Sequence, residues 1–440
     1  MAGDHDPVRS IVKGMDVSAY GRRLLGDSGT RSLMDDLGAI AAAGGAIMNL
    51  GGGSPSLIPA AEATFRRHME SLLRREGAFE RAIGLYGGPE GDRDFANALA
   101  ALFRREVGWK VTARNIALTN GSQSAFLPLF NLLAGPMDDG RPARRILLPL
   151  SPEYIGYADL GFTPGLFTAR RSTIHELDDK LFKYGVDFDG LDAVEDIGAI
   201  CVSRPTNPTG NVITDEEVER LGAIARARGV PLILDTAYGA PFPGIVFGES
   251  TPVWDEHTVV CMSLSKLGLP GFRTGIVIAN EELIEALAAA TAIYCLSPGR
   301  LGPALGTELI ENGALLPLAR DVIRPHYAER AARAVERLRA GLNDYPIRIH
   351  KPEGAFFLWL WMPGLPITNA ALYERLKQRD VVVVSGHYFF PGREDDDWPH
   401  KRECIRISYA DDWERTERGL DIIAEEVRRA YDGAIGRRTA

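Results

Sequence analysis

Short apolar runs alternate with amphipathic segments through the middle of this 440-residue chain. Four of the runs have the length and the Val, Ile and Leu content of buried strands, and they occupy residues 199–203, 231–234, 258–262 and 275–279. Between the first two runs, Thr214 begins a helix through a Thr-x-x-Glu capping box with Glu217, and Gly229 ends it. Strands that alternate with helices predict an α/β fold with a largely parallel sheet, in which ligands bind beyond the carboxyl ends of the strands.

The last third of the chain has a different pattern. A long charged helical pattern starts at Ile323, strand-like runs follow at 356–361 and 381–384, and a final helix begins at about Asp412. This order predicts a second, smaller α+β domain that the long helix connects to the first. We therefore expect three segments, namely an N-terminal arm with part of the small domain, a large ligand-binding domain and a C-terminal small domain, at residues 1–75, 76–322 and 323–440.

Composition and charge narrow the classes of partner. The net charge is −9 and the pI is about 5.5, which argues against a nucleic-acid partner. The four cysteines lie far apart and form no CxxC pair, so we expect neither a disulfide framework nor a metal site. The first residues include acids and no apolar signal region, and the longest nearly apolar run, 286–296, is too short to cross a membrane. We expect a cytoplasmic protein.

Polar clusters follow three of the four predicted strands. They have the sequences NPTG, DTAY and SLSK, at residues 207–210, 235–238 and 263–266. Each has an ordinary interpretation on its own, as a turn, a helix cap or a solvated lysine. Their occurrence together at successive strand ends favours one shared site.

The three clusters suit the chemistry of an aldehyde cofactor with a pyridine ring. The amine of Lys266 can condense with the aldehyde to form a Schiff base, and the freed amine can later move a proton as a general acid and base. Asp235 can hold the pyridine nitrogen protonated. Tyr238 and Asn207 can stabilise the ring oxygen as an anion. Tyr154 is placed to stack on the ring, although it can equally be an ordinary core tyrosine.

A phosphate group on such a cofactor needs amide groups at a helix start, hydroxyls and an arginine. The segment TNGSQS at 119–124 precedes an apolar helix that we expect to begin near Ala125. After the third strand, Ser263 and Ser265 supply hydroxyls and Arg273 supplies a guanidinium. The Ser265 side chain can either bind the phosphate or stabilise the turn. We expect these two segments to bind the phosphate through Gly121, Ser122, Gln123, Ser263, Ser265 and Arg273.

Several longer segments resemble one family of enzymes. The segments LGGGSPSLIP, ALTNGSQSAF, PEYIGYAD, SRPTNPTGNVITDEE, PFPGI, CMSLSKLGLPG and HKPEGAFFLWLW resemble the class I/II aminotransferases, most closely their valine–pyruvate subfamily. The similarity runs from about Gly45 to the C-terminal helix. It implies the fold-type I architecture, pyridoxal 5′-phosphate bound to Lys266, and amino transfer between a small neutral amino acid, such as valine or alanine, and a 2-oxo acid such as pyruvate.

The resemblance also implies residues for the substrate and for a partner subunit. The backbone N–H of Gly53 and the guanidinium of Arg406 would bind the substrate carboxylate, although Arg406 can instead form a surface salt bridge. Tyr86 resembles a tyrosine that reaches the cofactor phosphate of the neighbouring subunit. That position implies a homodimer with shared active sites.

Three positions depart from the family pattern. The interval between Lys266 and Arg273 is one residue shorter than in many relatives, and Ser385 stands where a proline is expected. Arg300 stands where a small residue is expected; it either points to solvent, pairs with an acid of the partner subunit, or faces an anionic substrate. Two alternatives therefore stay open: a pyridoxal-phosphate enzyme diverted to γ-substitution, carbon–carbon bond formation or oxidation, and a non-catalytic ligand sensor.

Overall fold

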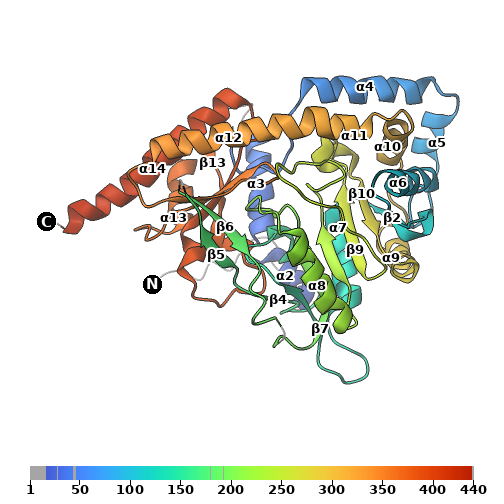
Figure 1. Ribbon diagram of the computed structural model, residues 1–440, viewed down its shortest axis with the longest axis horizontal. Helices are drawn as coiled ribbons and strands as arrows, with labels where there is room; N and C mark the ends of the chain where they lie inside the picture. The colour runs from blue at the N-terminus through green and yellow to red at the C-terminus, as the bar shows by residue number, and fades with distance from the viewer. Residues whose placement is uncertain (1–15, 27, 43–45, 179, 192, 439–440) are drawn as a thin grey trace.

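A seven-stranded sheet forms the centre of the larger lobe (Figure 1). The structure, a computed structural model, describes residues 16–438 except 27, 43–45, 179 and 192. In spatial order the strands are β2 (Ile116–Thr119), β10 (Gly275–Ile278), β9 (Thr258–Ser263), β8 (Leu232–Asp235), β7 (Ile197–Ser203), β3 (Arg145–Leu148) and β4 (Phe167–Ala169). Strands β9, β8, β7, β3 and β4 are parallel to one another, and β10 is antiparallel to both β9 and β2. The predicted, largely parallel sheet is confirmed.

The four predicted strands form β7, β8, β9 and β10, and no end differs from its expected position by more than two residues. Alternate residues of these strands pack on opposite faces of the sheet. Cys201 packs with Phe126 in one hydrophobic cluster, whereas Ile200 packs with Leu221 in another. Apolar side chains on both faces explain why the strands are continuous hydrophobic runs.

Helices cover both faces of this sheet. Helices α6 (Arg93–Glu106), α7 (Ser122–Leu133), α8 (Asp215–Ala227) and α9 (Glu281–Tyr294) contact its strands, α10 (Leu301–Glu311) packs on α6, and α4 (Pro59–Arg74), α5 (Ala78–Gly84) and α11 (Leu315–Pro317) pack on α10. Helix α8 begins as predicted: Thr214 Oγ1 accepts from the Glu217 N–H at 3.1 Å, and Glu217 Oε2 accepts from the Thr214 N–H at 2.8 Å. Helix α7 begins at Ser122 rather than near Ala125, because Gly121 has a φ of +91° and turns the chain directly into the helix.

A six-stranded sheet forms the second lobe. Its strands, in spatial order, are β14 (Val384–Ser385), β15 (Cys404–Ser408), β12 (Phe357–Trp361), β11 (Arg348–His350), β6 (Leu181–Gly185) and β5 (Thr173–Glu176). The run predicted at 381–384 is divided, because β13 (Val381–Val382) pairs with β1 (Met48–Asn49) instead. Strands β5 and β6 come from the segment 76–322; β6 pairs with β11, and β5 pairs with β6. The division at residues 75 and 322 stays a prediction.

Long helices connect and support the two lobes. Helix α12 (Arg324–Gly341) runs across the molecule between α11 and α14 (Trp413–Arg438), as Figure 1 shows. Helix α13 (Asn369–Lys377) packs beside α14. Among the described residues, no helix combines the length and the apolar character that a membrane span needs.

The N-terminal arm joins the lobes through α2 (Ala19–Leu25) and α3 (Gly29–Ala42). In α3, Asp36 accepts hydrogen bonds from the Tyr373 hydroxyl at 2.5 Å and from the Lys377 amine at 2.8 Å. Just before α3, the Ser28 hydroxyl donates to Asp159 at 2.5 Å. The first fifteen residues of the arm, on which the expectation of no secretory signal rests, lie outside the described residues.

The capping box of α8 predicts a measurable loss of stability on substitution. Thr214→Ala removes the acceptor of the Glu217 N–H, so the free energy of unfolding should fall by about 1 kcal/mol. Urea denaturation followed by circular dichroism measures the change. Thr64→Ala, which removes the same atoms from the half-exposed interior of α4, is the matched control. Equal losses in the two variants would contradict a specific role of the cap.

Candidate active site

Lys266 lies in η3 (Ser265–Leu267), three residues after the end of β9. Its Nζ donates to the Gly53 carbonyl at 2.6 Å and lies 5.4 Å from the centre of the Tyr238 ring. Burial, together with the charges of Arg406 and Arg273, lowers the pKa of the Lys266 amine to about 8, and the charge of Asp235 opposes this shift. An amine with a lowered pKa is a better nucleophile at neutral pH.

Asp235 ends β8 and is 6% exposed. Its Oδ2 accepts from the Tyr157 hydroxyl at 2.8 Å, and its Oδ1 accepts from the Ala237 N–H at 3.0 Å. Burial raises the pKa of Asp235 to about 6, and the hydrogen bonds from Tyr157 and Ala237 and the charge of Lys266 oppose this rise. A buried carboxylate held by two donors is suited to a cationic partner such as a protonated ring nitrogen.

Arg406 lies in β15, is 1% exposed and therefore forms no surface salt bridge. Its Nη1 donates to Asn207 Oδ1 at 2.8 Å and its Nη2 donates to the Gly51 carbonyl at 2.6 Å. The guanidinium lies 4.2 Å from the centre of the Phe357 ring, and its Nε has no hydrogen-bond partner among the described residues. Burial lowers the pKa of Arg406 to about 10. A buried cation with neutral partners and a free donor is suited to bind an anion.

The start of α7 and the turn after β9 form an anion cradle. Gly121 caps α7 without a side chain, so amide groups of the first turn are available. A Cβ atom at Gly121 would lie 2.1 Å from Arg273 Nη2, so the glycine lets the guanidinium approach the helix start. Arg273 Nη1 donates to Ser265 Oγ at 3.3 Å. The structure therefore brings Gly121, Ser122, Ser265 and Arg273 together.

Two residues expected in the cradle have their side chains bound elsewhere. Ser263 Oγ donates to the Thr274 carbonyl at 3.3 Å and accepts from the Ser265 N–H at 3.0 Å. Gln123 Nε2 donates to the Gly156 carbonyl at 2.8 Å, beside the turn that carries Tyr157. Their contact with a phosphate stays a prediction.

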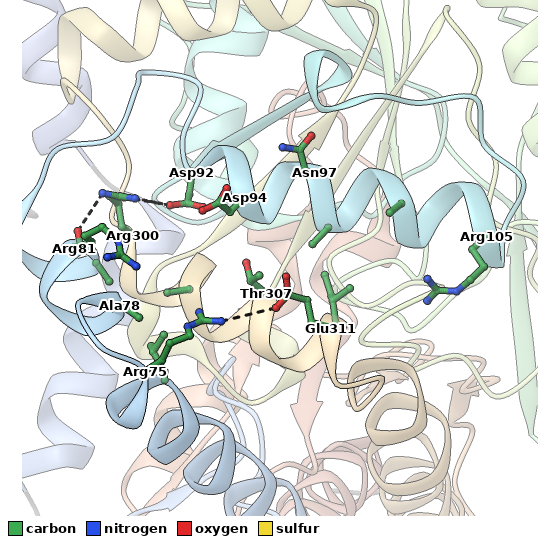
Figure 2. A pocket seen from close by; sticks show the side chains of 16 residues that line it. Arg75, Ala78, Arg81, Asp92, Asp94, Asn97, Arg105, Arg300, Thr307 and Glu311 are labelled. Carbon is green, nitrogen blue, oxygen red and sulfur yellow. Dashed lines mark hydrogen bonds and ion pairs between the residues drawn. The ribbon is translucent and has the colours of Figure 1, made fainter.

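Among the described residues, neither Tyr86 nor Arg300 contacts the Lys266 amine, which meets Gly53, Tyr238 and Phe356. The Tyr86 side chain is 85% exposed. Arg300 Nη2 and Nε contact Asp92 Oδ2 at 2.9 and 3.2 Å, and its Nη1 donates to the Arg81 carbonyl at 3.1 Å (Figure 2). Arg300 lines a cavity of about 750 Å³ between α4, α5, α6 and α10. Its acid partner thus belongs to its own chain, and a contact of Arg300 with the substrate stays a prediction.

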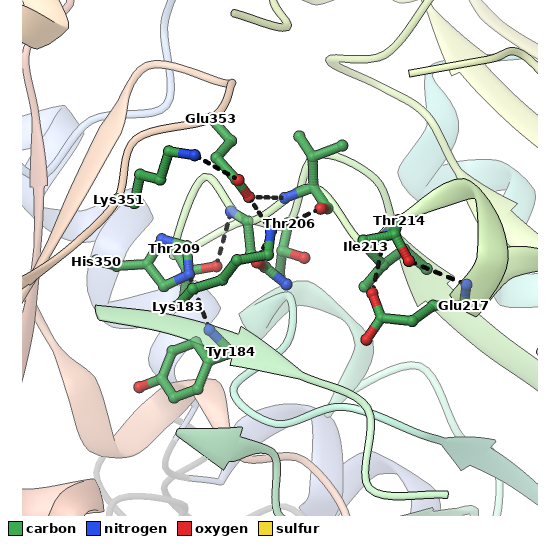
Figure 3. A network of polar contacts seen from close by, with 12 residues as sticks. Lys183, Tyr184, Thr206, Thr209, Ile213, Thr214, Glu217, His350, Lys351 and Glu353 are labelled. Atoms are coloured by element: carbon green, nitrogen blue, oxygen red, sulfur yellow. Dashed lines mark hydrogen bonds and ion pairs between the residues drawn. The ribbon is translucent and has the colours of Figure 1, made fainter. Parts of the chain in front are cut away.

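The loop that carries Asn207 is held by the second sheet. Lys183 Nζ on β6 donates to the Val212 carbonyl at 2.9 Å and to Asn211 Oδ1 at 3.2 Å, and it pairs with Glu353. Figure 3 shows this pair, and Glu353 Oε2 also accepts from the Val212 N–H at 3.1 Å. Lys183 and Glu353 were not predicted from the sequence, because residues so far apart in the chain give no local signal.

Tyr157 was also not predicted as a site residue, although the sequence around it contained a hint. Tyr157 ends η2 (Ile155–Tyr157) and lies three residues after Tyr154, in the segment PEYIGY. The two rings meet edge to face with their centres 5.2 Å apart. A second tyrosine at this spacing, next to one expected at the cofactor ring, was the available hint.

These groups fit pyridoxal phosphate. Because Gly121 has no side chain, the Arg273 guanidinium lies against the start of α7, where it and the amide groups of the first turn can bind a phosphate together. Lys266 supplies the amine for the aldehyde, and Asp235 supplies a buried carboxylate for the pyridine nitrogen. Tyr238, which is 4% exposed, and Asn207, which is 7% exposed, lie between these groups and Arg406 as candidates for the ring oxygen.

Removing the Tyr157 hydroxyl should raise the pKa of Asp235. The hydrogen bond stabilises the ionised carboxylate, so Tyr157→Phe should raise the pKa from about 6 to about 7, since a bond to a charged group contributes about 1.5 kcal/mol. The carboxyl group then takes up its proton at higher pH. ¹³C NMR titration of the cofactor-free, aspartate-labelled protein measures it, with Asp235→Asn to assign the signal. Tyr409→Phe should leave the value unchanged, and an unchanged value in Tyr157→Phe would contradict the interpretation.

Known proteins resemble this chain over nearly its full length. The family model for aminotransferase class I and II matches residues 46–423. Valine–pyruvate aminotransferase of Escherichia coli (strain K12) is 49% identical over 417 residues, which are 95% of this chain and 99% of that protein.

Solved structures agree with this result. A crystal structure from Psychrobacter arcticum 273-4 aligns with a TM-score of 0.92 and 43% identity, covering 95% of this chain and 100% of that one. Valine–pyruvate aminotransferase of Salmonella typhimurium LT2 aligns with a TM-score of 0.84 and 47% identity, covering 92% and 99%. The expected family, fold and cofactor are confirmed. The chain belongs to the class I and II aminotransferases, the pyridoxal-phosphate-dependent transaminases of fold type I.

Proposed function

We propose that this enzyme transfers an amino group between a small neutral amino acid, of the valine or alanine type, and a 2-oxo acid such as pyruvate. The observation that carries the proposal is the 49% identity to the E. coli valine–pyruvate aminotransferase, over 95% of this chain and 99% of that protein. The fold alone would not support this choice, because one scaffold hosts many reactions.

The residues of the site have complementary roles in this reaction. Bound pyridoxal phosphate supplies a pyridine ring that accepts electrons from the substrate Cα. The Lys266 amine moves the proton at that Cα, for which a pKa of about 8 is suitable at neutral pH. Asp235 holds a proton at the pyridine nitrogen. Tyr238 and Asn207 donate to the ring oxygen.

The substrate is held and selected by other groups. Arg406 binds the substrate carboxylate with its guanidinium group. Asn207 orients this group, because its Oδ1 accepts from Arg406 Nη1 at 2.8 Å. The N–H of Gly53 lies beside Lys266 and donates to the same carboxylate. Because Asp92 neutralises Arg300 within the chain, a neutral substrate side chain is favoured over an anionic one.

We also propose a homodimer with shared sites, in the cytoplasm. Three of the four residues 83–86 expose large apolar side chains: Ile83 is 60%, Leu85 59% and Tyr86 85% exposed. Such an exposed apolar run is suited to burial in an interface. In the dimer, Tyr86 would reach the phosphate cradle of the partner subunit, with the Arg300–Asp92 pair beside its turn.

Amino exchange tests the proposed substrates. Purified holoenzyme mixed with valine and pyruvate should yield alanine and the 2-oxo acid of valine in equal amounts, as chromatography measures. Lys266→Ala should reduce this turnover by at least about 10³-fold, because no other group can move the Cα proton. Faster turnover of aspartate or glutamate than of valine would contradict the neutral substrate. Products without amino exchange would contradict transamination itself.

Mixed dimers test the shared site. Chains with Tyr86→Phe are unfolded, mixed with Lys266→Ala chains and refolded. If Tyr86 serves the partner's cofactor, one site of each hybrid carries both defects and the other carries neither. Hybrids should therefore recover about half of the wild-type activity per dimer, and more than either parent. Hybrid activity no higher than that of the Tyr86→Phe parent would show that Tyr86 acts within its own chain or not at all.

A further inference from the structure

Glu153 is a buried carboxyl group to which none of the roles above applies. Its side chain is 0% exposed, and within the described part of the chain no Lys, Arg or His forms an ion pair with it. Burial raises the pKa of Glu153 to about 8; hydrogen bonds from Ser203 and Tyr154 oppose this rise, and the charge of Asp235 adds to it. A buried carboxyl group without a cation destabilises a fold unless donors satisfy it, so its place beside the site requires an explanation.

Three donors converge on this carboxyl group. Oε1 accepts from the Ser203 N–H at 2.8 Å, and Oε2 accepts from the Ser203 hydroxyl at 2.7 Å and from the Tyr154 N–H at 3.0 Å. The backbone N–H of Glu153 donates to the Phe389 carbonyl at 2.8 Å. One residue therefore connects the end of β7, the turn that carries Tyr154 and η6 (Gly386–Phe389).

Each of these three segments carries a part of the active site. Tyr154 is the candidate for stacking on the cofactor ring. Ser203 pairs with Asp235 across β7 and β8, so its position fixes that of the acid at the pyridine nitrogen. The ring of Phe389 lies under the Arg406 guanidinium, with 5.2 Å between guanidinium carbon and ring centre.

We propose that Glu153 is a positioning residue for the cofactor: its carboxyl group holds Tyr154 against the ring face and the end of β7 beside the ring nitrogen. The inference rests on the cofactor role given above for Asp235 and Tyr154. Glu153 does not contact the substrate and acts only through the groups that it holds. Its two oxygens accept from the two backbone amides, and the Ser203 hydroxyl can donate to the ionised carboxyl group or accept from the protonated one, so Glu153 holds both segments in either state.

Glutamine distinguishes this role from simple filling of space. Glu153→Gln keeps the shape of the side chain and replaces one oxygen with an amide group. In either orientation of that amide, one backbone N–H, that of Ser203 or that of Tyr154, faces a donor and loses its acceptor. The variant therefore loosens one of the two segments and removes no volume.

The test measures cofactor binding, and turnover is not needed. Apoenzyme is titrated with pyridoxal phosphate, and the visible circular dichroism of the bound cofactor reports how its ring lies. Glu153→Gln should bind the cofactor about ten-fold more weakly and should change the circular dichroism band. Glu308→Gln is the matched control, because Glu308 is 4% exposed, pairs with Arg75 at 2.9 Å and lies away from the site. Glu308→Gln should lower thermal stability but leave cofactor affinity and the circular dichroism band unchanged.

Wild-type affinity and an unaltered circular dichroism band in Glu153→Gln would overturn the proposal and make Glu153 purely structural. Ser203→Ala removes only the hydroxyl donor. It should shift both measurements in the same direction by a smaller factor, and it decides the question if Glu153→Gln does not fold. Because these measurements use no amino acid, failure of valine–pyruvate exchange would refute the proposed substrates and leave this inference standing.

Discussion

Parallel pairing of β7, β8 and β9 in one register is the constraint on which the active site depends. Within it, Asp235 pairs with Ser203 on one side and with Cys261 on the other. Side chains alternate between the faces of a sheet, so a shift of one residue would turn Asp235 to the opposite face. The apolar residues that pack on both faces make such a shift unfavourable. The register of the core therefore fixes the direction of Asp235, the buried acid that accepts a hydrogen bond from Tyr157. It also places Lys266 close to Asp235, because Lys266 lies just beyond the end of the neighbouring strand β9.

The second constraint is that the substrate half of the site belongs to the other sheet. Arg406 projects from β15 and is held by Asn207, which belongs to the large lobe. Lys183 and Glu353 bind the loop of Asn207 from the second sheet. Each lobe thus holds a group that the other lobe orients, so cofactor geometry and substrate geometry are set by the same contacts.

Local patterns in the sequence predicted local features well. The apolar runs gave four strands to within two residues, and the Thr214–Glu217 capping box formed as expected. Features that depend on distant pairing were not predictable. An apolar run has the same sequence pattern whether its strand is parallel or antiparallel, so the antiparallel direction of β10 could not be predicted. Strand β6, with β5 beside it, joins the second sheet by pairing with β11, which lies more than 160 residues away in the chain. The role of Glu153 was not predicted: it was noted only as part of the segment PEYIGYAD, because the sequence does not show that an acid is buried.

The triple-glycine turn at 51–53 limits where a side chain could be added beside the active site. A Cβ atom at Gly51 would lie 3.0 Å from Val382, and one at Gly52 would lie 2.6 Å from Asn49, so neither position readily accepts a side chain. At Gly53 a Cβ atom would meet only Lys266 Nζ within 4 Å, at 3.7 Å. Within this turn, only Gly53, the position that faces the reacting amine, could carry a Cβ atom without displacing a neighbouring atom. A single added methyl group there would narrow the space for the substrate and leave the architecture unchanged.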